Sequence, residues 1–171
     1  MNHKNVAAAI YMAALCAQSV YAQELEAPPE QDQSEVAREL AALLAWRLGP
    51  EAVFEWCKDA DPEGNAARSK EVTGWLTRNA DLIKQVDERV AEVIPLVYSP
   101  PPGVDAIPAV HAQIKSILHE GLVEGKSPEE LKTNCQAEAK HDNPRWANPG
   151  MRHVQQSLAV LYDWKFRLEK K

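Results

Sequence analysis

The segment after residue 58 has most of the acidic positions of a calcium-binding loop. Asp59, Asp61 and Glu63 match positions 1, 3 and 5 of an EF-hand pattern, and Gly64 matches position 6. Calcium prefers such oxygen ligands, but the pattern also needs a bidentate acid at position 12, where this chain has Lys70. The segment is therefore an incomplete calcium candidate. The alternative is an acidic turn in which Asp61 caps the next helix.

Four polar side chains could bind an anion inside a helical bundle. Arg47, Asn79 and Lys165 fall within apolar helical stripes, and Arg68 is a further candidate. A buried charge is costly without a partner, so convergence of these residues would create a cationic pocket for a carboxylate or phosphate. The alternatives are that the cations reach the surface or pair with Asp and Glu, and that Asn79 fixes helix register.

The remaining polar residues do not form a catalytic or metal-binding pattern. His111, His119, His141 and His153 lack metal-ligand spacing. The chain contains no GxSxG motif and no glycine-rich loop that could bind phosphate. We therefore expect no metal and no cofactor, and a binding protein is favoured over an enzyme.

Three short segments resemble the start of the exported chorismate mutases. They are Arg47-Leu48, Phe54-Glu55-Trp56 and the run from Arg68 to Val72. The resemblance implies an all-helical enzyme that binds a dicarboxylate with Arg and Lys inside the bundle. Glu55 stands where that pattern would have a cationic Lys, and its carboxylate would repel the substrate. The alternative function is thus a small-molecule-binding or enzymatic bundle of this kind.

Two of the five tryptophans are candidates for a partner surface. Trp46 projects away from the apolar face of its own helix, and Trp146 lies in an irregular segment rich in proline. Exposed tryptophans often anchor protein partners. Alternatively, other helices could cover the Trp46 helix on two sides.

The first 22 residues have the features of a secretory signal peptide. Lys4 precedes an apolar run from Val6 to Leu15, and Val20-Tyr21-Ala22 fits the rule for a cleavage site. The alternative, a membrane anchor, requires a longer apolar run. We expect a periplasmic or secreted protein in which residues 23–33 form a flexible leader and residues 34–171 form one domain.

The charge of the mature chain limits its partners. Without Lys4, 18 basic residues face 25 acidic residues, which gives a net charge of −7. An acidic chain is a poor ligand for nucleic acid or anionic lipid. No later segment is long and apolar enough for stable membrane insertion. We expect the partner to be another protein, with a basic surface favoured.

Two cysteines remain after signal cleavage, Cys57 and Cys135. In an exported chain, the simplest prediction is one disulfide between them. The alternative is two free thiols.

Apolar periodicity predicts helices over most of the mature chain. The most regular stripe runs from Val72 to Val93, within a helix expected over residues 66–94 and ended by Pro95. A single continuous helix is favoured there, although Asn79 could start a new one. Gly49-Pro50 is expected to separate helices over residues 34–48 and 51–58.

Further helices are expected over residues 107–124, from residue 128 and from residue 149. Few segments alternate with the period of a strand. The sequence therefore predicts an all-α, single-domain bundle of about six helices, with one long central helix and a Cys57–Cys135 disulfide. Its expected function is binding of another protein.

Overall fold

The computed structural model describes residues 30–140 and 151–170 of the chain. The predicted signal peptide, most of the leader and Trp146 lie outside these residues. The described part contains no strand and six α-helices, which confirms the all-α bundle. The helices are α2 (Glu30–Ala60), α3 (Asn65–Arg78), α4 (Ala80–Val97), α5 (Ala106–Val123), α6 (Pro128–Glu138) and α7 (Met151–Glu169), and a 3₁₀ turn, η1 (Pro62–Gly64), precedes α3.

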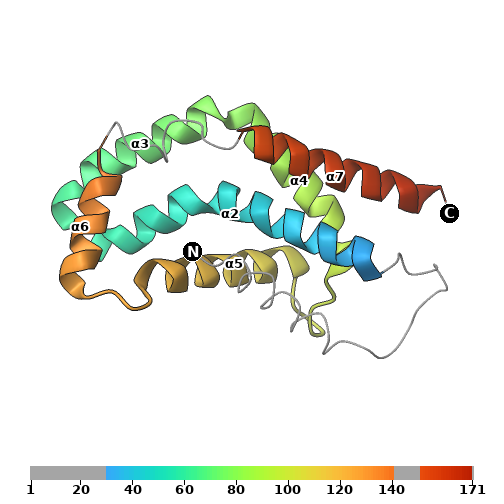
Figure 1. Ribbon diagram of the computed structural model, residues 1–171, viewed down its shortest axis with the longest axis horizontal. Coiled ribbons are helices and arrows are strands. Elements are labelled where there is room, and N and C mark those ends of the chain that lie inside the picture. Colours follow the sequence, from blue (N-terminus) through green and yellow to red (C-terminus); the bar gives the residue numbers. More distant parts are fainter. Residues whose placement is uncertain (1–29, 141–150, 171) are drawn as a thin grey trace.

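The helix α2 is the centre of the bundle. It is 31 residues long and packs against each of the other five α-helices in the described part. Figure 1 shows α7 and α5 on opposite sides of α2. The helix α4 contacts both α5 and α7 as well as α2. These four helices therefore enclose one core.

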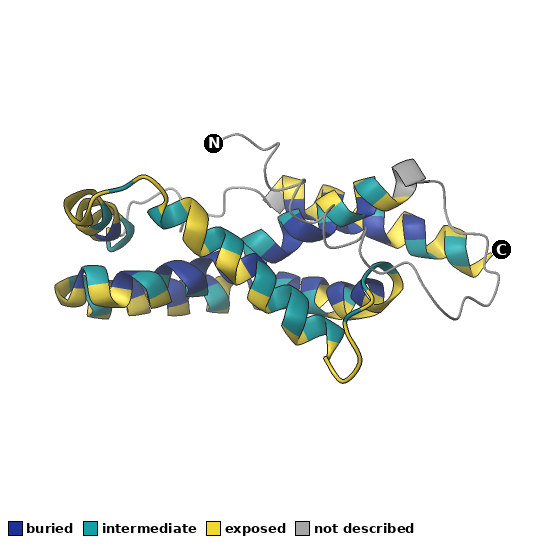
Figure 2. Cartoon of the chain, turned by 90° about the horizontal axis from the view of Figure 1, so that it is seen from below, coloured by how far each residue is buried: buried dark blue, intermediate teal, exposed yellow. Residues whose placement is uncertain are grey.

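The main core is formed by apolar residues that face inward from α2, α4, α5 and α7 (Figure 2). The C-terminal part of the predicted stripe is confirmed, because Val86, Val90 and Val93 are buried at its centre. The other buried members include Val36, Leu40, Leu43, Leu44, Leu48, Ile94, Ile114, Val154, Leu158, Leu161 and Trp164. Burial of this surface is the main force that stabilises the bundle.

The predicted helix break at Gly49-Pro50 was wrong, because α2 continues through both residues. Proline lacks an N–H and bends a helix, but it removes only one backbone hydrogen bond. Leu48 and Val53, on either side, are buried at 4% and 1% exposure. Continued burial keeps the chain helical there, and Figure 1 shows α2 bent near its middle. The long central helix is thus α2.

The prediction of one continuous helix over residues 66–94 was also wrong. The helix is interrupted at Asn79, which has φ −106° and ψ 11°. Its side-chain amide donates to the carbonyl oxygen of Trp75 at 2.8 Å, and its backbone N–H donates to the same oxygen at 3.1 Å. Asn79 is buried at 3% exposure, so these bonds satisfy its amide group within the joint between α3 and α4.

The helix α4 also extends past Pro95, where the sequence analysis expected its end. Pro95 lies in the last turn of α4, so its ring disturbs little of the helix. The backbone N–H of Tyr98 donates to the carbonyl oxygen of Ile94 at 2.9 Å, which closes the last turn of α4.

The predicted disulfide is confirmed. Cys57 of α2 and Cys135 of α6 have Cα atoms 5.4 Å apart and are joined by a bond. Both residues are fully buried, and they form a small apolar cluster with Val53. The disulfide links the last turn of α2 to the last turn of α6.

We predict that the disulfide stabilises the fold strongly. It spans a sequence separation of 78 residues. Closing such a loop should contribute about 4 kcal/mol on the chain-entropy estimate. Reduction should therefore lower the midpoint of urea unfolding measured by circular dichroism. The double variant Cys57→Ala/Cys135→Ala should unfold near the reduced wild type and should not respond to reductant. Equal midpoints for the oxidised and reduced protein would contradict this prediction.

Candidate functional site

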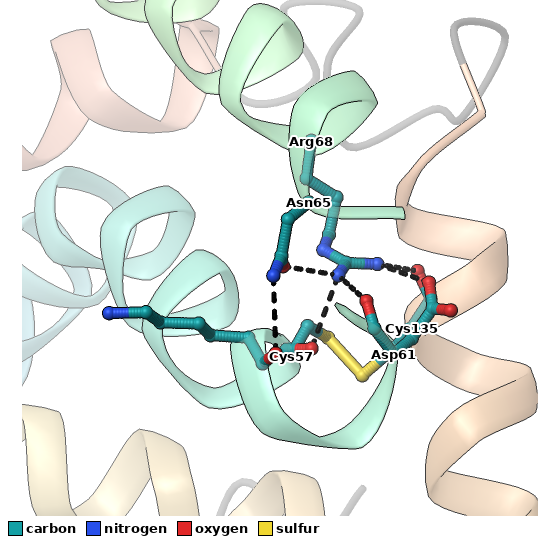
Figure 3. Close-up of polar contacts among 6 residues, drawn as sticks. Cys57, Asp61, Asn65, Arg68 and Cys135 are labelled. Atoms are coloured by element: carbon teal, nitrogen blue, oxygen red, sulfur yellow. Dashed lines mark hydrogen bonds and ion pairs between the residues drawn. A yellow bond between two sulfur atoms is a disulfide. The ribbon is translucent and has the colours of Figure 1, made fainter. Parts of the chain in front are cut away.

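The guanidinium of Arg68 is the centre of a buried polar network (Figure 3). Its Nη1 atom donates to Asp61 Oδ2 at 2.6 Å and to the carbonyl oxygen of Cys135 at 3.0 Å. Its Nη2 atom donates to the carbonyl oxygen of Cys57 at 3.1 Å and to Asn65 Oδ1 at 2.7 Å. It also donates to the carbonyl oxygen of Asp61. We call these five residues the Arg68 latch.

The latch forms because two helix ends meet the first turns of α3. Cys57 lies in the last turn of α2, Asp61 directly follows that helix, and Cys135 lies in the last turn of α6. The carbonyl oxygens of Cys57 and Cys135 already accept from the backbone N–H groups of Asp61 at 2.9 Å and of Ala139 at 3.2 Å, and they carry the partial negative charge of a helix C-terminus. The guanidinium placed between them is a second donor to each oxygen. The latch is therefore a structural contact that joins α2, α3 and α6.

The latch also accounts for the acidic segment that resembles a calcium loop. Asp61 is buried at 2% exposure, and its carboxylate is bound by Arg68. Asp59 and Glu63 are exposed. Across residues 30–140 and 151–170, no group of three or more His, Cys, Asp and Glu side chains is placed to hold a metal ion. The structure therefore assigns the Asp61 carboxylate to Arg68.

Arg47 of α2 has two carboxylate partners, one on its own helix and one on α4. Its Nε atom donates to Asp87 Oδ1 at 3.1 Å, and its Nη1 atom donates to Glu51 Oε1 at 3.0 Å. Burial works to lower the pKa of Arg47, but the hydrogen bond to Glu51 and the charge of Asp87 outweigh it and raise that pKa. Arg47 therefore stays charged at the edge of the core.

His111 of α5 lies next to this ion-pair cluster. Burial is the main cause of a lowered pKa for His111, and the charges of Arg47 and Lys115 lower it further. The carboxylates of Asp87 and Glu51 act in the opposite direction. Within the described residues, the buried Nε2 atom of His111 has no hydrogen-bond partner. The neutral imidazole is therefore the favoured form in the folded protein.

Lys165 of α7 pairs with α4 at a different place. Its Nζ atom is 3.0 Å from Glu92 Oε2 and 3.5 Å from Glu169 Oε1. Glu92 and Asp87 are five residues apart on α4, so they point about 140° away from each other. The structure thus places Lys165 and Arg47 on different sides of α4. It places Arg68 in the latch and Asn79 at the joint between α3 and α4.

Trp46, a candidate partner anchor, contacts another tryptophan within the chain. Its ring centroid is 4.9 Å from that of Trp75, which is buried on α3. Trp46 is half-buried and packs on both the main core and the Trp75 cluster. The burial of Trp46 agrees better with the alternative interpretation, in which other helices cover the Trp46 helix on two sides.

The sequence analysis missed an exposed aromatic surface on the outward side of α7. Tyr162 and Phe166 are 47% and 54% exposed. The Arg89 guanidinium lies 3.5 Å from the centroid of the Tyr162 ring. The Nζ atom of Lys170 lies 4.2 Å from the centroid of the Phe166 ring. Tyr162, Phe166 and Arg89 border a shallow depression, which is lined by Arg89, Ala159, Tyr162, Asp163, Lys165, Phe166 and Glu169. We call this surface the α4–α7 face.

The α4–α7 face is fixed to the bundle by charged contacts. Arg89 is only 10% exposed and its Nη1 atom is 2.7 Å from Glu92 Oε2. Glu92 thereby joins Arg89 of its own helix to Lys165 of α7. The hydrogen bond from Lys165 is the main cause that lowers the pKa of Glu92. A signal was present in the sequence, because Ala159, Tyr162 and Phe166 have the helical spacing of three and four.

We predict that Gly64→Ala breaks the latch and destabilises the fold by about 2 kcal/mol or more. A Cβ atom at Gly64 would lie 2.1 Å from Asp61 Oδ2 and 2.5 Å from Arg68 Nη1. The matched control is Gly74→Ala in α3, whose Cβ would approach only the flexible end of Arg78 at 3.0 Å. That substitution should stabilise by up to about 1 kcal/mol, since alanine is the better helix former.

Urea unfolding of both variants checks this prediction. Equal effects of the two substitutions would show that helix propensity, rather than space beside the ion pair, controls stability at Gly64.

We also predict that His111 makes the fold less stable in acid. Its folded pKa is lowered, so the unfolded chain binds the proton more readily. The free energy of unfolding should therefore fall as the pH drops through about 6.5, the unfolded value. His111→Gln should flatten this slope, measured between about pH 7.5 and 5.5. His119→Gln, at an exposed position on α5, should retain it. A slope unchanged by His111→Gln would refute the assignment.

The geometry of these sites is the only guide to function, because comparison with known proteins finds no relative. No protein-family model, no curated protein and no solved structure matches the chain. The resemblance to exported chorismate mutases therefore rests on the segments within residues 47–72 alone.

Proposed function

We propose that this chain is an exported helical protein that binds another protein through the α4–α7 face. The observation that carries this proposal is the exposure of Tyr162 and Phe166, one turn apart on α7, beside Arg89. Tyrosine and arginine are enriched among the residues that dominate binding energy at protein interfaces. Neighbouring exposed rings that are rimmed by charged side chains are typical of protein interaction sites.

The arrangement of the face suits recognition without large rearrangement. Arg89 is held by Glu92 on one side and by the Tyr162 ring on the other. Side chains that are already ordered lose less conformational entropy on binding. Tyr162 and Phe166 each have few rotatable bonds, so they supply contact area at a low entropic cost.

The proposed location is the periplasm or the extracellular space. The signal-like residues 1–22 favour export, and disulfides such as Cys57–Cys135 persist mainly in oxidising compartments. None of the helices in the described residues is both long and apolar enough to cross a membrane.

The proposed partner is a protein rather than nucleic acid. The mature net charge of −7 opposes binding to nucleic acid and favours approach of a basic protein at long range. The face itself carries both signs, since Arg89 and Lys165 lie beside Glu92 and Asp163. Local contacts there should select a partner that also carries both signs.

An interior small-molecule site has less support. Arg47, Arg68 and Lys165 each bind a carboxylate of the chain itself. Because these charges are already compensated, an anionic ligand would have to displace the carboxylates.

We predict that capture of a protein partner depends on the two exposed rings. Immobilised mature protein should retain one or more proteins from the exported fraction of the producing cell, at both low and high salt. Tyr162→Ala/Phe166→Ala should lose this retention, because truncation of such anchors commonly costs about 2 kcal/mol or more. Val104→Ala is the matched control, since Val104 is 47% exposed in a loop elsewhere. Identical retention by all three proteins would rule out the α4–α7 face.

A further inference from the structure

We propose that α6 is a redox-controlled element of the fold: reduction of the Cys57–Cys135 disulfide releases α6 from α2, while the main core stays folded. This inference is independent of the α4–α7 face, to which α6 contributes no residue. Three observations carry it: the small buried surface of α6, the local hydrogen bonds at its start, and the two contacts that fasten it to the rest of the chain.

The helix α6 buries little of its own surface. It has 11 residues, and Cys135 is the only one of them that is buried. Leu131 and Glu138 are half-buried, and the other eight residues are exposed. Cys135 is also the only residue of α6 that belongs to an apolar cluster, whereas α7 contributes four buried residues to the main core. Burial of apolar surface therefore holds α6 on the bundle only weakly.

The start of α6 is stabilised by local hydrogen bonds. The Oγ atom of Ser127 accepts from the backbone N–H of Glu130 at 3.3 Å, and Glu130 Oε2 accepts from the backbone N–H of Ser127 at 2.7 Å. These bonds move with α6, so release of the helix breaks neither of them. A helix of this length is only marginally stable on its own in water. Released α6 should therefore lose the protection of its backbone amides.

Two contacts at Cys135 fasten α6 to the rest of the chain (Figure 3). The first is the disulfide to Cys57 of α2. The second is the latch, because Arg68 donates to the carbonyl oxygen of Cys135 at 3.0 Å and to that of Cys57 at 3.1 Å. Both contacts act on one residue of α6. Reduction removes the covalent contact and leaves a hydrogen bond, for which water can compete.

Reduction requires access to sulfur atoms that the folded chain covers. Cys57 and Cys135 are both 0% exposed, so a reductant reaches them only when α6 separates locally from α2. One thiolate of a dithiol attacks a cysteine sulfur, and the other cysteine leaves as a thiolate. The second thiolate of the dithiol then displaces the first cysteine and closes the dithiol into its own disulfide. Two electrons and two protons thus pass from the dithiol to the two cysteines.

Release of α6 uncovers a surface that the oxidised protein hides. Val53 and Cys57 of α2 are buried at 1% and 0% exposure, and Trp56 packs against their cluster. Departure of Cys135 opens this cluster and removes one acceptor from Arg68. An oxidising compartment therefore keeps this apolar surface of α2 covered, and a reducing one exposes it.

Hydrogen–deuterium exchange of the mature chain, residues 23–171, tests the release. After treatment with dithiothreitol, alkylation and mass spectrometry should count two free thiols. The amides of α6 should then exchange about tenfold faster or more than in the oxidised protein, while those of α4 and α7 keep their protection. Unchanged protection of α6 in the reduced chain would overturn the inference. An equal loss of protection in all the described helices would also overturn it, because reduction would then unfold the whole bundle.

The rate of reduction under native conditions tests the role of the latch. Gly64→Ala, whose Cβ would overlap the latch, should speed reduction by dithiothreitol by about tenfold or more. Gly74→Ala in α3 is the matched control and should leave the rate unchanged. If Gly64→Ala does not fold, Asn65→Ala takes its place, since it removes an acceptor that Arg68 binds at 2.7 Å.

Val154→Ala separates local opening from global unfolding. Val154 is buried in the main core, so this variant weakens the bundle without touching the latch. It should leave the rate of reduction unchanged, because opening of α6 does not require the core to unfold. Equal acceleration by Val154→Ala and Gly64→Ala would show that the reductant reaches the disulfide by global unfolding, and the inference would fail. It would also fail if neither latch variant changed the rate.

Discussion

The buried guanidinium of Arg68 is the contact on which one end of the molecule depends. It is fully buried and donates to carbonyl oxygens of α2 and α6, including those of both disulfide cysteines. Lysine could not replace it, because an ammonium lacks the planar fork that reaches several acceptors at once. The latch in turn requires Gly64, since any side chain there would occupy the space of the Asp61–Arg68 pair. The disulfide and the latch therefore reinforce each other at the same junction.

The other end of the molecule is stabilised by different means. Here α2, α4, α5 and α7 share the main apolar core, and α7 is aligned by contacts at its edges. Ser157 donates to Glu39 at 2.6 Å, and Lys165 pairs with Glu92. Burial tends to raise the pKa of Glu39, but hydrogen bonds from Ser157 and Arg38 outweigh it and keep the carboxyl ionised. The helix α2 runs through both ends of the molecule, and the burial of Leu48 and Val53 keeps it helical through Pro50 between them.

The sequence predicted what local periodicity controls and missed what tertiary contacts decide. Helical spacing located the helices and the buried stripe through Val86 and Val90, and export predicted the disulfide. Pro50 was misjudged because local propensity favours a break there, whereas burial on both sides keeps α2 helical. Asn79 was misjudged because the apolar period continues past it, whereas its buried side chain bonds the Trp75 carbonyl at the joint between α3 and α4. The need of Arg47, Arg68 and Lys165 for partners was predictable. Helical spacing also predicts the partners Glu51 and Glu169, each four residues after its cation. The partners Asp87, Asp61 and Glu92 were not predictable, because they come from distant or irregular segments.

The aromatic stripe of α7 shows a further reason why sequence alone falls short. Helical spacing is the same for an inward and an outward stripe, so Tyr162 and Phe166 are indistinguishable by period from the core residues beside them. Only the placement of α2 and α4 decides which side of α7 is covered. Once Val154, Leu158 and Leu161 face the core, the second stripe must face outward. Its rings then remain uncovered by the described chain, and their burial by a partner would stabilise α7 on the side that the bundle does not reach.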